Sequence, residues 1–294
     1  MIISCAPQKV QCLVARRDEE TYLRQAGFEQ VRAIGLPIVY TNPSGVKRIP
    51  NSILIMPMHC IPGDNRATDN SDYVNEVERA TRGFDRRAVC VSGRCMANGL
   101  WVSQFQRAGV EVIHGASVND ANALRRMRAL FETFEFMTTG TYGSHVPYAL
   151  YFGARISLWG PSRALTREYL LRDELWSRFP DAVDQLLSQE SVEKAEKLLG
   201  RFRVEPQRGI ADQDFGGWMV GAENRLSSSD LRKAFGWDLV ARGRGMFQDV
   251  RDQLALRTRW KRLLTRTNSN YVNDRQRQSD SERTHRGNTS KELC

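Results

Sequence analysis

The sequence lacks the features of several protein classes. None of its 294 residues lie in an apolar run of about 18 or more, so no segment predicts a membrane-spanning helix. The chain does not start with a charged segment followed by an apolar one, which argues against a secretory signal and favours a cytoplasmic protein. Its four histidines are scattered and its six cysteines form no Cys-x-x-Cys pair. This spacing predicts no metal site and fits thiols in a reducing compartment.

The composition is that of a folded protein with a basic balance. Hydrophobic residues make up 41% of the chain and aromatic residues 9%, which excludes a chain that is disordered throughout. There are 43 Lys plus Arg residues against 34 Asp plus Glu, for a formal net charge of +9. Residues 251–266 have the pattern of a basic amphipathic helix, in which leucines and Trp260 alternate with Arg and Lys.

Short apolar segments alternate with helical patterns through the first half of the chain. Residues 9–15 and 31–40 predict strands on either side of a helix that opens with acidic residues and ends at Gly27. The turn-rich segment 41–51 predicts a linker. From residue 52 onward the alternation predicts an α/β fold with a Rossmann-like, mostly parallel sheet covered on both faces. Strands are expected at 53–56, 88–91, 110–114, 136–139 and 155–158, and helices at 73–83, 99–109, 121–134 and 146–152.

Strand patterns fade after residue 161. Helices are expected at 165–178, 181–187, 191–199 and 228–235. The end of the chain is almost entirely polar and predicts a disordered tail. We therefore expect a βαβ remnant of an N-terminal half at 1–45, a Rossmann-like domain at 46–165, a helical region at 166–266 and the tail at 267–294.

Glycine-bearing loops follow three of the expected strands. The carboxyl ends of parallel strands meet at one edge of a sheet, and ligands bind there. Residues 138–145 read Thr-Thr-Gly-Thr-Tyr-Gly-Ser-His and offer backbone N–H groups and hydroxyls, for which phosphate is the natural ligand. The other two loops are 114–120, which leads into an arginine-rich helix, and 92–99. Together they predict a nucleotide-type pocket.

Structural interpretations of these side chains stay open beside the functional one. Ser144 can serve as the N-cap of its helix. His145 can contact a diphosphate or a sugar hydroxyl, or it can form a structural hydrogen bond. Arg125 can bind phosphate through two parallel hydrogen bonds, whereas Arg126 and Arg128 can form a solvated basic helix face.

The segments around these loops resemble a known enzyme family. The matching segments are 136–146 (FMTTGTYGSHV), 148–157 (YALYFGARIS), 112–116 (VIHGA) and the Gly-Leu-Pro at 35–37. They resemble the C-terminal, donor-binding half of bacterial surface-polysaccharide glycosyltransferases of the GT-B type, which build capsule or lipopolysaccharide. The resemblance covers roughly residues 10–165 and extends less distinctly through 176–199 and 225–237.

The resemblance implies a nucleotide-sugar donor as substrate, no bound cofactor, and a glycan or lipid-linked glycan acceptor. It implies that the loop ahead of residue 146 holds the donor diphosphate. The residues that this assigns to donor binding are Gly143, Ser144 and His145, with Thr139 and Thr141 nearby and with His114, Asp120, Asn122 and Arg125 lining the same cleft. Backbone N–H groups and arginine can stabilise the departing nucleotide phosphate without a metal.

A complete GT-B enzyme has an acceptor-binding N-terminal half that usually supplies the catalytic base, and it is much longer than the roughly 45 residues ahead of this linker. Related enzymes also often carry His-Pro where this chain has Ser92-Gly93. Three explanations stay open: the chain is a fragment, another polypeptide supplies the acceptor half, or the protein no longer catalyses transfer. No catalytic residue is assigned.

The leading hypothesis is a glycosyltransferase-like protein of surface-polysaccharide biosynthesis that transfers sugar to a glycan acceptor. The alternative is a non-catalytic binding module, either a truncated transferase homologue or a basic protein that binds nucleic acid or membrane. No RNA-binding signature appears, so no specific nucleic acid is expected as a partner. Residues 251–266 are expected to dock on an anionic membrane surface, at the inner face of the cytoplasmic membrane, or to pack in the core.

Overall fold

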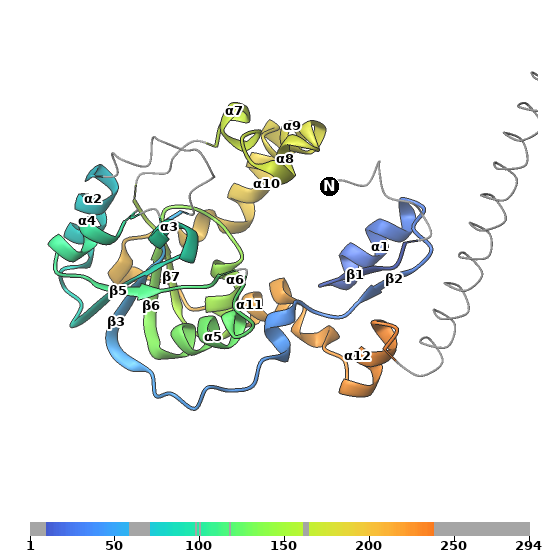
Figure 1. Ribbon diagram of the computed structural model, residues 1–294, viewed down its shortest axis with the longest axis horizontal. Coiled ribbons are helices and arrows are strands. Elements are labelled where there is room, and N and C mark those ends of the chain that lie inside the picture. The colour runs from blue at the N-terminus through green and yellow to red at the C-terminus, as the bar shows by residue number, and fades with distance from the viewer. Residues whose placement is uncertain are drawn as a thin grey trace, which may run out of the picture. The chain divides into compact units, whose positions relative to one another are not determined.

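The computed structural model describes residues 10–58, 71–97, 99, 101–117, 119–160 and 165–237 (Figure 1). The basic segment 251–266 and the tail 267–294 lie outside the described residues. The chain divides into two units, residues 1–226 and 227–294. In the second unit, α12 (Ser228–Ala234) begins after Ser227, whose hydroxyl accepts the N–H of Asp230, so a helix is present where one was expected.

Five parallel strands form the main sheet, which confirms the predicted α/β, Rossmann-like fold. They are β3 (Ile49–Ile55), β4 (Arg86–Val91), β5 (Glu111–His114), β6 (Phe134–Thr139) and β7 (Arg155–Leu158). Their spatial order is β5-β4-β3-β6-β7. The chain builds outward from β3 to β5 and then returns to place β6 on the other side of β3. The strand order therefore reverses between β3 and β6, the position at which open α/β sheets bind ligands.

Helices cover both faces of this sheet (Figure 1). On one face, α2 (Ser71–Thr81), α3 (Gly93–Ala97) and α4 (Val102–Arg107) share a core with Ile55. On the other face, α5 (Ala123–Thr133) and α6 (His145–Tyr151) share a core with Leu54. Adjacent residues of β3 thus point into opposite cores, as expected for a strand that is buried on both sides.

The expected loop at 92–99 is wrong in part. Residues Gly93–Ala97 form α3, and the Ser92 hydroxyl lies 3.4 Å from the backbone nitrogen of Cys95. Cys95 is buried beside Trp101 in the core beneath α2. Burial of apolar side chains such as Cys95 favours a short helix here. The segment therefore does not form an open glycine loop.

Short helices follow the sheet, and one of them was not expected. The expected helix at 165–178 is two short helices, and the Gly-Gly pair at 216–217 concealed α11, because glycine is a poor helix former. The helices are α7 (Arg167–Leu170), α8 (Glu174–Ser177), α9 (Pro180–Leu186), α10 (Gln189–Leu199) and α11 (Gln213–Val220), with 3-10 segments η1 (Pro37–Tyr40), η3 (Gly200–Phe202), η4 (Pro206–Arg208) and η5 (Ala222–Asn224). None of the helices in the described ranges combines the length and apolar character that crossing a bilayer requires.

The N-terminal βαβ element is present, but the strand expected at 31–40 is wrong in part, because it ends at Ala33 and Pro37–Tyr40 form η1. Strands β1 (Cys12–Val14) and β2 (Val31–Ala33) pair in parallel, and α1 (Arg17–Gln25) connects them. After the helix the backbone passes through Gly27 with φ +91°, a conformation that glycine adopts without strain. Its small core is built from Leu23, Phe28 and Val31.

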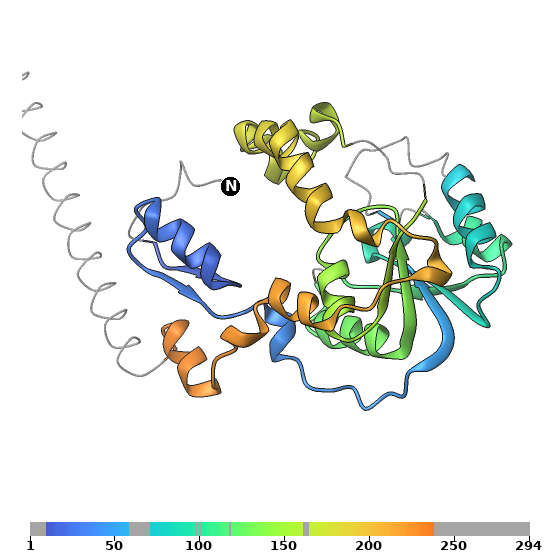
Figure 2. The ribbon, with the colours of Figure 1, turned by 180° about the vertical axis from the view of Figure 1, so that it is seen from behind.

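The segment after α11 returns to this N-terminal element. The side chain of Asn224 is buried, donates to the carbonyl of Ala15 at 3.1 Å and accepts from Arg17 Nε at 3.2 Å. The N–H of Leu36 donates to the Val220 carbonyl at 2.8 Å. Figure 2 shows this segment, in orange, beside the blue η1. The N-terminal element is therefore fastened by backbone and buried polar contacts.

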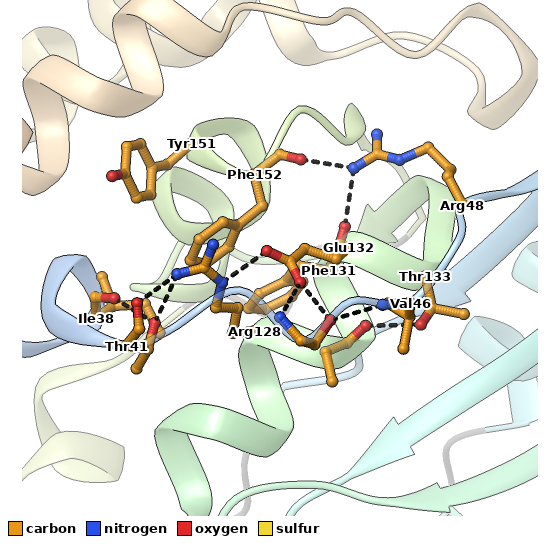
Figure 3. A network of polar contacts seen from close by, with 12 residues as sticks. Ile38, Thr41, Val46, Arg48, Arg128, Phe131, Glu132, Thr133, Tyr151 and Phe152 are labelled. Atoms are coloured by element: carbon orange, nitrogen blue, oxygen red, sulfur yellow. Dashed lines mark hydrogen bonds and ion pairs between the residues drawn. The ribbon is translucent and has the colours of Figure 1, made fainter.

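The linker is held against α5 by a polar network (Figure 3). Arg128 donates to the carbonyl of Thr41 and to Glu132 Oε1 at 2.6 Å, and Glu132 accepts the N–H of Ser44 at 2.9 Å. Arg48 donates to the carbonyl of Phe152 at 2.5 Å. The side chain of Arg128 is only 14% exposed, so the expectation that it lies on a solvated face is wrong. Arg128 is held there because the backbone carbonyl of Thr41 in the linker accepts a hydrogen bond from it.

Candidate functional site

The loop between β6 and α6 lies at the switch point of the sheet. The carbonyl of Thr138 in β6 accepts the N–H of Met56, the residue that follows β3, at 2.9 Å. The two strands therefore end side by side, and residues 139–145 leave the sheet at the carboxyl edge where its order reverses. This is the position that the parallel-sheet rule assigns to a ligand.

A buried hydroxyl organises this loop. Thr139 is fully buried, and its Oγ1 donates to the carbonyl of Thr141 at 3.0 Å and lies 3.3 Å from the Thr141 nitrogen. The same oxygen lies 3.1 Å from Nε2 of His145. The His145 ring also packs on Gly143, where a Cβ would approach it to 2.9 Å. One threonine thus fixes both the turn and the imidazole.

Three consecutive backbone N–H groups of the loop have no hydrogen-bond acceptor among the described residues. These are the N–H groups of Tyr142, Gly143 and Ser144. The side chains of Tyr142 and Ser144 are exposed. Because α6 has only seven residues, with Pro147 in its first turn, its dipole is small. The loop N–H groups, and not the helix dipole, are therefore the main groups here that could attract an anion.

Ser144 does not cap α6 through its side chain. Its backbone is helical, with φ −56°, and the side chain accepts no capping hydrogen bond. Burial raises the pKa of Tyr148, and the hydrogen bond with Ser144 offsets part of that rise. The interpretation of Ser144 as a side-chain cap is therefore wrong.

The N-terminal element brings a cation to this loop. The guanidinium of Arg16 lies 4.6 Å above the ring of Trp218 and pairs with Asp18 at 2.9 Å and with Glu19 at 3.2 Å. Burial raises the pKa of Tyr142, and the charge of Arg16 counteracts that effect. Sequence reasoning missed Arg16, because nothing in the pattern shows that its charge acts on the Tyr142 hydroxyl.

The other predicted residues lie at the end of β5 and near the start of α5. His114 is exposed at the end of β5, and strands β4 and β3 stand between it and β6, a separation of about 14 Å at the usual strand spacing. Asp120 forms an ion pair with Arg126 and accepts the N–H of Asn122 at 2.8 Å. The structure thus pairs Arg126 within the protein. Asn122 and Arg125 are exposed near the start of α5.

An acidic pair that the sequence interpretation passed over has a structural use. Asp212 and Asp214 flank Gln213 at the start of α11. Asp212 accepts the N–H of Phe215 at 2.9 Å and pairs with Arg201 at 2.6 Å, so it caps the helix. No group of three or more metal-ligating side chains occurs among the described residues.

Comparison of the sequence with known proteins adds no assignment to this site. No protein-family model matches the chain, and no curated protein matches it. The resemblance of residues 136–146 to glycosyltransferases therefore stays a prediction, and the chemistry of the loop has to be judged from its geometry.

Proposed function

We propose that the chain binds a nucleotide sugar through its diphosphate at residues 139–145 and acts as a glycosyltransferase of bacterial surface-polysaccharide assembly. The observation that carries this proposal is the coincidence of two features. The loop leaves the sheet at its switch point, and three consecutive N–H groups in it have no acceptor among the described residues. Diphosphate oxygens are strong acceptors that fit such a row of donors.

The neighbouring side chains suit the same ligand. Arg16 acts electrostatically on Tyr142 while it pairs with Asp18 and Glu19, and the exposed rings of Tyr142 and Trp218 offer apolar surface to a nucleobase. The His145 ring is hydrogen-bonded to the Thr139 hydroxyl, which also holds the turn. In this arrangement the N–H groups stabilise the charge that develops on the departing nucleoside diphosphate, and the sugar passes to a glycan or lipid-linked glycan acceptor.

A proline substitution tests the backbone N–H of Ser144 directly. The residue has φ −56°, close to the angle that proline imposes, and its N–H has no protein acceptor in the described chain. Ser144→Pro therefore deletes one donor with little strain. By isothermal titration with UDP, GDP, CMP and their sugar conjugates, we expect one donor to bind and Ser144→Pro to weaken it at least about tenfold, the value of one charged hydrogen bond.

Two further variants separate the N–H from other effects. Ser144→Ala keeps the N–H and removes the hydroxyl, so its affinity should fall by no more than a few-fold. Ser103→Ala, at an exposed serine of α4 on the opposite face of the sheet, should bind as the wild type does. Equal binding by the wild type and a folded Ser144→Pro, or no binding of any nucleotide, would refute the proposed site.

A further inference from the structure

A cavity of about 660 Å³ opens between α2 and the segment that follows β7. Its volume is within the range of about 300–1,000 Å³ that small-molecule sites occupy. Four of its residues lie on one face of α2, one is the last residue of β7, two follow that strand, and one follows η3. The lining residues are Asp72, Asn75, Glu76, Arg79, Leu158, Trp159, Gly160 and Arg203.

Buried polar groups without partners border this cavity. Trp159 lines it, and its Nε1–H is buried with no acceptor in the described structure. The ring of Tyr73 packs on Gly160, where a Cβ would lie 3.0 Å from it, and the Tyr73 hydroxyl is also buried with no hydrogen bond of normal geometry. Among the described residues only Arg87 has another such atom, and it faces Glu78 at 3.6 Å. Because its Nε1 atom is shielded from solvent, Trp159 offers the cavity its ring and not its N–H group.

The charges in the lining balance. Asp72 and Glu76 oppose Arg79 and Arg203, and Glu76 pairs with Arg79 at 2.8 Å. Because the lining has no net charge, it offers no field that favours a multiply charged ligand. It instead alternates the Asp72 carboxylate with the Asn75 amide and with two guanidinium groups, which pair with Glu76 and Glu196. Hydroxyl groups, which both donate and accept, match this alternation.

We propose that this cavity binds a neutral saccharide. An aromatic side chain beside carboxylate, amide and guanidinium groups supplies both an apolar surface for a sugar's C–H groups and partners for its hydroxyls. Arg79 at the rim is 65% exposed, so a glycan chain can continue from the cavity into solvent.

The cavity shares a wall with the proposed diphosphate loop. The backbone N–H of Trp159 donates to the carbonyl of Thr139 at 3.0 Å. On the other side, burial raises the pKa of Tyr73 and the neighbouring N–H of Gly140 offsets part of that effect. A saccharide in the cavity therefore lies next to residues 139–145. Its role as the glycan acceptor rests on the proposed function, whereas saccharide binding itself does not.

Saturation-transfer NMR on the full chain tests saccharide binding. The probes are neutral di- and trisaccharides of glucose, galactose, mannose, rhamnose and N-acetylglucosamine, with glucose 1-phosphate as a charged comparison. We expect at least one neutral probe to bind. Asp72→Ala removes one acceptor and Trp159→Phe reduces the aromatic surface, and each should weaken binding about tenfold or more. The matched variants Asp85→Ala, outside the cavity, and Trp176→Phe, in the core of α7 and α9, should leave it unchanged.

Three outcomes would overturn the saccharide proposal: no neutral probe binds, only glucose 1-phosphate binds, or Asp72→Ala binds as the wild type does. Asp72 is exposed on α2, so its variant is expected to fold even where Trp159→Phe does not. The proposed function fails separately. If a saccharide binds and no nucleotide does, only the proposed donor site is refuted. If a nucleotide binds and no saccharide does, only the saccharide proposal for the cavity is refuted.

Discussion

The backbones of Gly35 and Gly221 approach each other so closely that neither position has room for a side chain. Both have positive φ, +76° and +66°. A Cβ on Gly221 would lie 2.0 Å from the carbonyl oxygen of Ala15 and 3.2 Å from the Cα of Gly35. This contact joins the β1-α1-β2 element to the segment after α11, and with it positions Arg16 near the loop at 139–145.

Gly221→Ala should therefore destabilise the protein more than a positive φ alone explains. Gly45 is the matched control, because it has φ +75° and nothing lies within 4 Å of where its Cβ would be. Gly45→Ala should cost about 1 kcal/mol, the strain of a left-handed residue, and Gly221→Ala at least about 2 kcal/mol more. Urea unfolding measures both. Equal losses would contradict the close approach.

Adjacent glycines of α11 should respond to alanine with opposite signs. A Cβ on Gly216 would lie 2.4 Å from the backbone nitrogen of Tyr151 in α6, whereas the nearest atom to a Cβ on Gly217 is 3.9 Å away. Gly216→Ala should lower the free energy of unfolding by about 2–3 kcal/mol, the usual cost of overpacking. Gly217→Ala should raise it by about 0.5–1 kcal/mol through helix propensity. Thermal unfolding of the two variants measures both changes. A Gly216→Ala variant as stable as the wild type would rule out this packing of α11 on α6.

The sequence pattern predicted the sheet well and the site less well, for a physical reason. Periodicity reports burial, so the alternation of apolar strands and helices identified all five strands. It does not report which strands are neighbours, and so it could not place His114 three strands from Thr139. The cavity was equally hidden, because Asp72 and Trp159 meet only once α2 packs beside the end of β7. Contacts between distant segments come from topology, which one sequence does not state.

Glu132 should stabilise the linker in a pH-dependent way. Burial alone would raise the pKa of Glu132, but hydrogen bonds from Ser44 and Arg128 bring it below its usual value. A carboxylate with a lowered pKa in the folded state contributes stability above its unfolded pKa and loses it as the pH falls through the folded value. Glu132→Gln should therefore cost about 1–2 kcal/mol at pH 7 and much less near pH 3. Urea unfolding at the two pH values measures the difference.

The exposed pair of Arg172 and Glu168 is the control for this effect. It has the same i,i+4 spacing as Arg128 and Glu132, but the Glu168 side chain is 82% exposed. Glu168→Gln should leave stability nearly unchanged at both pH values, because solvent screens the pair. A loss in Glu132→Gln that stays constant between pH 7 and pH 3 would contradict the ionic network.

Cys90 should resist alkylation while the protein is folded. Burial raises the pKa of its thiol to about 12, against a smaller opposing effect of Arg126. At pH 8 only about one thiol in ten thousand would then be ionised, and the thiolate is the reactive form. Iodoacetamide followed by peptide mass spectrometry should modify the partly exposed Cys12 first and Cys90 only after denaturant is added. Fast native labelling of Cys90 would show that this core is open.

Thr139 connects the fold of the loop to its proposed chemistry. Valine has nearly the shape of threonine, so Thr139→Val removes only the hydroxyl that holds Thr141 and the Nε2 atom of His145. We expect the nucleotide identified by titration to bind about tenfold more weakly, because the turn loses the contacts that orient its N–H groups. Thr139→Ser keeps the hydroxyl and should bind within a few-fold of the wild type.

Thr133→Val separates this effect from a general loss of stability. The Thr133 hydroxyl donates to the carbonyl of Ala129 at 2.7 Å in the last turn of α5, so the same chemical change is made away from the loop. We expect this variant to bind nucleotide as the wild type does. If Thr139→Val folds and binds with unchanged affinity, the hydroxyl does not organise a binding turn, and His145 is then a structural residue whose hydrogen bond serves only the fold.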